Sequence, residues 1–213
     1  MNASSKIERG PSTSLRSRVR EQVRAAILDS AEQEFSAREL KAVRMEDVAA
    51  RAGVSVGTLY NYFGDREHLV AELLTLRGTE IIQGLDRALE EHEGSNFAQQ
   101  LRALLRVMFT HIEDHRRLLT RIIDGEMESG SSSGRTAHGQ LKRMLWERLA
   151  QLVQRGVDSG ELDRNGSELF PTLLVGMSRA AVVHPIVHSN STISVDERVE
   201  VCARVFLQGT RVV

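Results

Sequence analysis

The run Met45–Tyr62, MEDVAARAGVSVGTLYNY, followed by Phe63, constrains the fold of this chain more than any other segment. Its spacing predicts a short helix, a tight turn and a second short helix. Gly53 can adopt the left-handed conformation that ends a helix sharply. Ser55 is a favourable N-cap for the helix that follows, and the small Ala49 lets that helix cross closely. This pattern is typical of a helix-turn-helix, whose second helix enters the major groove of DNA.

The second of these helices, Val56–Phe63, carries outward polar residues that a purely structural helix does not need. Hydroxyl groups can donate to phosphate oxygens, and an asparagine can pair with an adenine edge. The alternative is a small three-helix bundle in which the tyrosines only cover the core. We predict phosphate contacts from Thr58, Tyr60, Tyr62 and Arg66, base contacts from Val56, Gly57 and Asn61, and further contributions from Ser55 and Arg44.

These residues resemble the DNA-binding domain of the tetracycline-repressor (TetR) family of transcriptional regulators. The resemblance covers about residues 16–75 and implies an N-terminal helix-turn-helix domain followed by a helical ligand-binding and dimerisation domain. It rests on Val48-Ala49, Ala52-Gly53-Val54-Ser55, Gly57-Thr58-Leu59-Tyr60, Tyr62-Phe63 and Arg66.

Three positions depart from the family pattern. Arg44 stands where the family often has a capping Thr, Val56 stands where Lys is frequent, and Arg66 replaces the usual Lys. Arg44 can reach a phosphate, and Val56 can touch a thymine methyl group. These departures leave the DNA-binding reading intact but make the operator sequence unpredictable.

Composition and charge agree with a helical protein that has a basic N-terminal end. The chain has 213 residues, three prolines, 41% apolar residues and only 4% aromatic residues, which favours an aliphatic, helical core. Residues 1–24 carry six basic and two acidic side chains, whereas residues 67–213 carry 17 basic and 20 acidic side chains. A basic end beside a helix-turn-helix supplies sequence-independent attraction to phosphates. The alternative is an ordinary solvated tail.

We predict an all-α fold of about nine helices in three parts. These are a disordered basic tail (residues 1–15), a three-helix helix-turn-helix domain (16–66) and a helical ligand-binding and dimerisation domain (67–213). Apolar periodicity and capping residues predict helices over Arg16–Phe35, from Asp65 to about Glu90, from Asn96, over Arg116–Met127, over Gln140–Ser159, from Asn165 to Val183, and from Ser194. Glu128–Gly139 is predicted to be a flexible loop.

The last two predicted helices are apolar on more than one side, which indicates burial beyond a single subunit. We predict that they form a homodimer interface, a four-helix bundle across a two-fold axis. The resemblance implies the same arrangement. The alternative is a helix buried wholly within one subunit.

We predict a pocket for a small hydrophobic or amphipathic effector in the C-terminal domain, and no other cofactor. Trp146 is the sole indole and can stack on a flat ligand. The simpler interpretation of each candidate is a core residue. The candidate walls are Met108, Phe109, Ile112, Met127, Trp146, Phe170, Leu174 and Met177.

Two histidine pairs with a spacing of four, His111/His115 and His184/His188, suggest a metal site. Neither pair has a nearby Cys or a Glu at useful spacing, and Pro185 interrupts the second pair. We therefore predict structural or solvated histidines and no metal. The single Cys202 lies on an apolar stripe and is predicted to be a buried thiol.

The sequence lacks a phosphate-binding loop, a nucleophile elbow and a secretory signal, and it has no long apolar span. We therefore predict a cytoplasmic DNA-binding regulator and not an enzyme, with no catalytic residues. More specifically, we predict a repressor that binds a palindromic operator as a homodimer and is released by a small-molecule effector. The alternatives are a dimeric helical adaptor or ligand-binding protein with vestigial DNA binding, and a transcriptional activator.

Overall fold

A computed structural model describes residues 14–39, 42–118, 132–187 and 192–210 of the chain. Its regular elements in these ranges are all helical, which confirms the predicted all-α fold. They are α1 (Leu15–Ala37), α2 (Met45–Ala52), α3 (Val56–Phe63), α4 (Arg66–Glu91), α5 (Phe97–Asp114), α7 (Ser132–Asp158), a 3-10 helix (Ser167–Leu169), α8 (Phe170–Val187) and α9 (Val195–Thr210).

Capping residues define where these helices begin. Asn96 accepts a hydrogen bond from the Gln99 N–H at 2.9 Å, and the Gln99 side chain accepts one from the Asn96 N–H at 3.3 Å. Ser194 and Glu197 form the same reciprocal pair at the start of α9. Two otherwise unpaired donors are satisfied at each start, so both predicted helix starts are confirmed.

The buried side chains form two separate hydrophobic cores. The first joins α1, α2, α3 and the first half of α4, and the second joins the rest of α4 with α5, α7, α8 and α9. Helix α4 contributes Leu69 and Leu73 to the first core, and Ile81 and Leu85 to the second. A single continuous helix therefore links the helix-turn-helix to the C-terminal part.

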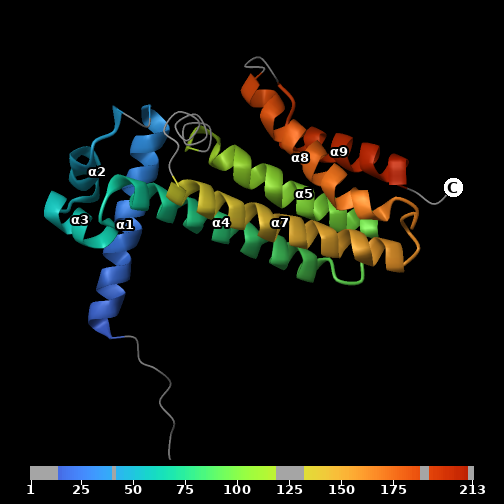
Figure 1. The fold of residues 1–213 in the computed structure, drawn as a ribbon, viewed down its shortest axis with the longest axis horizontal. Helices are drawn as coiled ribbons and strands as arrows, with labels where there is room; N and C mark the ends of the chain where they lie inside the picture. Colours follow the sequence, from blue (N-terminus) through green and yellow to red (C-terminus); the bar gives the residue numbers. More distant parts are fainter. Residues whose placement is uncertain (1–13, 40–41, 119–131, 188–191, 211–213) are drawn as a thin grey trace, which may run out of the picture.

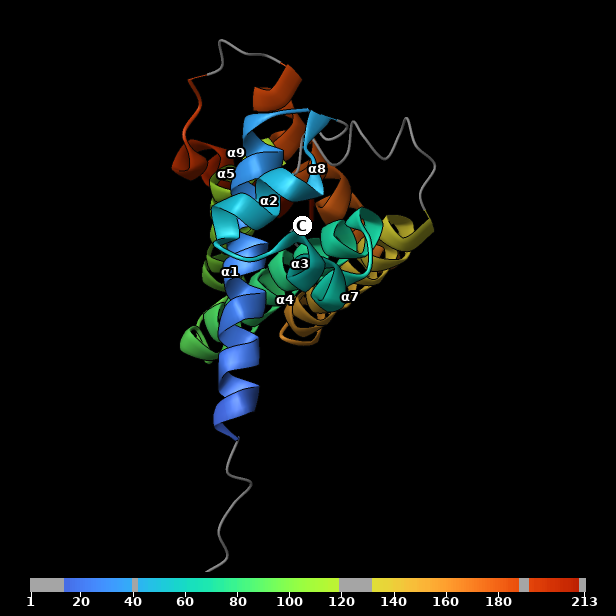
Figure 2. The same ribbon diagram turned by 90° about the vertical axis from the view of Figure 1, so that its left-hand side faces the viewer.

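The helices are arranged along one long axis. In Figure 1, α1, α2 and α3 gather at one end, α4, α5 and α7 run lengthwise, and α8 and α9 lie toward the other end. Figure 2 looks at the first end and shows α2 and α3 in front of the lengthwise helices. The residues that resemble a DNA-binding domain thus lie far from the two C-terminal helices.

Ion pairs reinforce the packing of α1 on its neighbours. Arg51 of α2 donates through Nε to Glu34 Oε1 at 2.6 Å, and the Glu34 side chain is almost fully buried. Arg24 of α1 pairs with Glu72 of α4. Charge-assisted hydrogen bonds are directional, so they fix the orientation of α1 as well as its proximity.

Three predicted boundaries are wrong. The helix predicted to start at Asn165 begins as a 3-10 helix over Ser167–Leu169, and α8 itself starts at Phe170. The predicted loop Glu128–Gly139 is helical from Ser132 onward, because adding residues to an existing helix costs much less than nucleating one. Helix α8 runs through Pro185 to Val187, past its predicted end at Val183. The proline lacks a backbone N–H, so the helix continues through Pro185 with one backbone hydrogen bond fewer.

Some predictions fall on residues that the structure does not describe. These include most of the predicted tail, Met127, and the part of the predicted sixth helix that follows Leu118. Leu118 is described and is buried in the first core. In the described ranges, no helix is long and apolar enough to cross a membrane.

Gly156 gives a direct test of the packing of α7. A Cβ atom at this position would lie 2.7 Å from Phe97 Cδ2, a buried ring atom, and 2.9 Å from Leu162 Cδ1. We expect Gly156→Ala to lower the free energy of unfolding by about 1–2 kcal/mol, since overpacking outweighs the gain in helix propensity.

The matched control is Gly139→Ala in the same helix, where no atom of the described part of the chain lies within 4 Å of the added Cβ. This variant should be neutral or more stable by up to about 1 kcal/mol. Urea denaturation of both variants measures the difference. Equal stabilities would show that α5 and α7 pack less closely than described.

Candidate nucleic-acid interface

The turn between α2 and α3 has the geometry that its sequence predicts. Gly53 has φ 69°, in the left-handed region, and the Val54 N–H donates to the Ala49 carbonyl at 3.0 Å. Val48, Ala49 and Leu59 are fully buried against one another in the first core. These contacts fix the direction in which α3 leaves the turn, and therefore the face that it presents to solvent.

Two of the predicted contact residues belong to the start of α3. Ser55 Oγ accepts from the Thr58 N–H at 3.0 Å and lies 2.8 Å from Thr58 Oγ1. Ser55 is therefore the N-cap of α3, as predicted. A Cβ added at Gly57 would meet only Ser55 Oγ, at 3.9 Å. The backbone at Gly57 is thus open to close approach by another molecule.

The middle of α3 presents Tyr60 and Asn61 to solvent. The Tyr60 side chain is 44% exposed and Asn61 is also exposed. The opposite side of the helix buries Leu59 and Phe63, and Val56 packs partly against the first core. Gly57, Tyr60 and Asn61 therefore form one outward surface, whereas Val56 is only partly accessible.

Tyr62 is held between α3 and α1. Its ring packs against the first core, and the Arg20 guanidinium carbon lies 5.8 Å from the ring centroid. This distance is within the range of a cation–π interaction. The contact places Arg20 beside α3, and Arg16 and Arg18 are exposed on the same end of α1. Positive charge on α1 thus lies next to the outward face of α3.

Arg66 begins α4 and is less exposed than the sequence suggests. Its guanidinium carbon lies 5.9 Å from the Phe35 ring centroid, and its buried Nη2 has no hydrogen-bond partner among the described residues. Burial lowers the pKa of Arg66 below its usual value. An unpaired guanidinium N–H group is costly to bury, so an acceptor that reaches it would be bound favourably.

Arg44 precedes α2 and has an exposed side chain. Its backbone N–H donates to Asp47 Oδ2 at 3.4 Å, and Arg38 Nη1 donates to the same oxygen at 2.9 Å. Asp47 therefore caps this end of α2, which leaves the Arg44 side chain pointing into solvent near the helix-turn-helix.

The predicted ligand-site residues are scattered through the second core. Met108, Phe109, Phe170 and Leu174 are buried there, and Ile112 and Met177 are partly buried. Trp146 is 45% exposed, and Met127 lies outside the described residues. Of those that the structure describes, none lines either of two clefts, of about 630 and 570 Å³, that lie beside α4. The assignment of these residues to an effector pocket stays a prediction.

The sequence did not predict a specific role for Arg20 at this surface. It indicated only that the N-terminal end of the chain is basic. The contact between a cation on α1 and the ring of Tyr62 can be predicted only when the crossing of α1 and α3 is known. The excess of arginines in residues 16–24 was the available signal, but it did not identify which one lies beside α3.

Residues 27–73 match the family described as bacterial regulatory proteins, tetR family. The chain is 29% identical over 160 residues to the uncharacterized HTH-type transcriptional regulator YhgD of Bacillus subtilis (strain 168), an alignment covering 73% of this chain and 80% of YhgD. It is 35% identical over 82 residues to the HTH-type transcriptional repressor Rv3405c of Mycobacterium tuberculosis, covering 34% of this chain and 44% of that protein.

Solved structures share the whole fold at low sequence identity. The fatty acid degradation regulator FadR of Bacillus halodurans has a TM-score of 0.76 at 17% identity, covering 95% of this chain and 97% of that one. FadR of Bacillus subtilis, solved in complex with stearoyl-CoA, has a TM-score of 0.75 at 16% identity, covering 87% and 98%.

The matched segment contains the residues that build and orient α3, and the relatives are transcriptional regulators and not enzymes. Residues 27–73 therefore form a DNA-binding domain of the kind found in the tetR family of bacterial regulatory proteins, with its helix-turn-helix at α2 and α3, and the similar proteins support a transcriptional regulator of this type.

Proposed function

We propose that this regulator is a cytoplasmic repressor that binds a palindromic operator as a homodimer and is released by a small-molecule effector. The observation that carries the DNA part of the proposal is the outward surface of α3. Gly57, Tyr60 and Asn61 face solvent on a helix whose other side is locked into the first core. Such a surface suits insertion into a major groove.

In this proposal the residues divide by the part of DNA that they contact. Tyr60, Tyr62, Thr58 and Arg66 bind phosphates, which gives affinity without sequence information. Asn61 and the exposed backbone at Gly57 face base edges, where donors and acceptors differ between base pairs. The arginines at the start of α1 add attraction that falls with increasing salt.

The partner proposed for α8 and α9 is a second copy of this chain. Leu173 on α8 is 54% exposed, and Val201 and Val205 on α9 are 47% and 50% exposed. The two helices contact each other, and contiguous exposed apolar side chains mark interaction surfaces. Two copies related by a two-fold axis would cover these side chains reciprocally and would read a palindrome.

The effector is proposed to act through the second core. FadR of Bacillus subtilis, which shares the fold, was solved in complex with stearoyl-CoA, so acyl-CoA thioesters are the first class to test. Phe109 and Leu174 are fully buried, and a ligand entering between them would displace α5 or α8. To switch the protein almost completely, it must favour the released state by about 5.5 kcal/mol.

Selection of the purified protein on random duplex DNA at near-physiological salt tests the proposal as a whole. We expect an enriched palindrome whose half-sites are spaced by about one helical turn or a multiple of it. Binding without an enriched sequence would contradict operator recognition and favour the adaptor alternative. Whether bound protein represses or activates depends on the operator position, which a reporter assay with the enriched sequence measures.

Two variants of α3 separate phosphate contacts from base contacts. Tyr62→Phe keeps the ring under Arg20 and removes only the hydroxyl, so affinity should fall about tenfold on every sequence, as expected for one hydrogen bond to a charged group. Asn61→Ala should mainly change the preferred base, by about 1–3 kcal/mol at one position. Titration on operator and single-mismatch duplexes measures both effects.

Gln154→Ala on α7 is the control for this pair, because its side chain lies far along the chain from α3 and pairs with Asp158. It should bind every duplex as the unmodified protein does. A Tyr62→Phe variant that changes base preference, or an Asn61→Ala variant that weakens all sequences equally, would overturn the assignment of roles.

A charged residue on the exposed face of α8 tests the dimer. Leu173→Asp should convert a dimer of twice 23.8 kDa to a monomer, because a buried unpaired charge is strongly unfavourable. Sedimentation equilibrium measures the mass. Leu15→Asp is the matched control, since Leu15 is also exposed, at 70%, but lies on α1. A Leu173→Asp variant that stays dimeric would place the interface elsewhere.

A further inference from the structure

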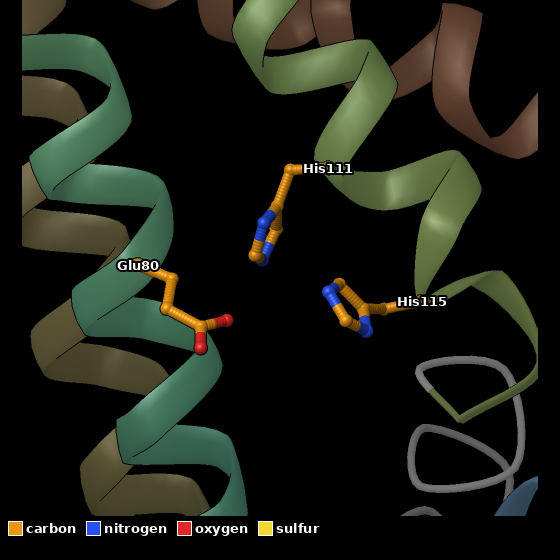
Figure 3. Close-up of side chains that lie close together, drawn as sticks. All are labelled: Glu80, His111 and His115. Carbon is orange, nitrogen blue, oxygen red and sulfur yellow. The ribbon is translucent and has the colours of Figure 1, made fainter. Parts of the chain in front are cut away.

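Two histidines and a glutamate from two helices meet between α4 and α5. The side chains of Glu80, His111 and His115 each offer one ligand atom, and these atoms all lie within 4.8 Å of one another. His111 lies in the last turn of α5 and His115 is its C-cap, four residues on, so both lie on one side of the helix end, and their ring centroids are 4.7 Å apart. Figure 3 shows both rings and the Glu80 carboxylate turned toward a common point.

His115 is held in the orientation that a metal ligand requires. Its Nδ1 lies 2.6 Å from Glu32 Oε1 on α1. A carboxylate accepts hydrogen bonds, so the proton of a neutral imidazole resides on Nδ1 and the Nε2 lone pair is available. In Figure 3 one ring nitrogen of His115 faces Glu80 and His111. Histidines that ligate metals commonly donate their other N–H to a carboxylate in this way.

Glu80 is also oriented by a neighbour that leaves it free to bind. Arg77 Nη1 donates to both Glu80 oxygens at 2.7 Å, and Arg77 Nε donates to Glu32 Oε2 at 2.9 Å. A carboxylate has about four acceptor positions, so Arg77 leaves lone pairs of Glu80 available. Glu32 therefore supports two of the three ligands, one directly and one through Arg77.

His111 has the access that a metal site needs. Glu80 and His111 line the open cleft of about 570 Å³ between α4 and α5, which provides a path for an ion and space for a bound water.

We propose that Glu80, His111 and His115 bind one divalent ion of the zinc class, with Glu32 and Arg77 as its supporting shell. Two imidazoles and one carboxylate form a set that Zn²⁺ favours, with a fourth position open to water. Bonds of about 2.0–2.2 Å to one ion are compatible with ligand atoms that all lie within 4.8 Å of one another.

Occupancy of this site would fasten α1 to α4 and α5, because Glu32 belongs to α1. The site adds to the proposed function and does not rest on it, since metal binding is measurable without DNA. A failure here and a failure of operator binding are therefore distinguishable.

Calorimetric titration of Zn²⁺ into the metal-free full chain tests the ligand set. We expect one ion per chain, with binding lost in His111→Ala and in His115→Ala, and weakened at least tenfold in the conservative variant Glu80→Gln. His92→Ala is the control and should bind normally, because His92 lies outside the proposed ligand set, with its Nδ1 2.9 Å from the Ala88 carbonyl oxygen. Circular dichroism verifies that each variant is folded.

The supporting shell has its own matched pair of variants. Glu32→Gln should weaken Zn²⁺ binding about 10- to 100-fold. Glu72→Gln breaks another ion pair between α1 and α4, with Arg24, and should leave Zn²⁺ affinity unchanged. Absence of binding to the unmodified protein, or binding that survives loss of both histidines, would overturn the site. Equal effects of the two glutamate variants would overturn the role of Glu32.

Discussion

The continuity of α4 through both hydrophobic cores is the constraint on which the rest of this structure depends. Leu69 and Leu73 are buried with the helix-turn-helix, and Ile81 and Leu85 are buried with the C-terminal helices. Protein cores are close-packed and transmit displacement. A shift of α4 within the second core must therefore move the first core, and the position of α3 changes with it.

Polar contacts lie where α4 passes from the first hydrophobic core to the second. Arg77 lies between Leu73 and Ile81 along α4 and pairs with Glu32 of α1, and His115, directly after α5, contacts the same glutamate. Apolar burial alone would hold the helices together without fixing one orientation. Hydrogen-bonded charges have preferred directions, so the contacts among Arg77, Glu32 and His115 select one angle between α1 and the lengthwise helices. The proposed metal site would strengthen the same contacts.

The local features of the fold were predictable because short-range physics determines them. Gly53, Ser55 and Asn96 act on their own turns through backbone conformation or capping, and such signals are readable in the sequence. The start of α7 was not predictable, because its Gly- and Ser-rich first turns have weak helix propensity and extend a helix that forms after them.

The candidate sites divide in the same way. The surface of α3 was largely predictable, since a helix of known direction has a known outer face. The grouping of Glu80 with His111 was not, because the two residues come from different helices, and the spacing rules search only along one helix. Trp146 illustrates the same limit, since periodicity placed it among apolar neighbours while the packing of α7 leaves it exposed.

The burial of the Arg77–Glu32 ion pair also determines how this protein responds to ionic strength. The Arg77 and Glu32 side chains are only 14% and 16% exposed, and ion pairs that are partly buried are screened much less than exposed ones. Phosphate contacts, in contrast, weaken steeply as salt displaces them. Rising salt would therefore detach this regulator from DNA while the helix-turn-helix and the C-terminal helices keep their relative orientation. Ionic strength would then weaken the complex with DNA and leave the geometry of the free protein unchanged.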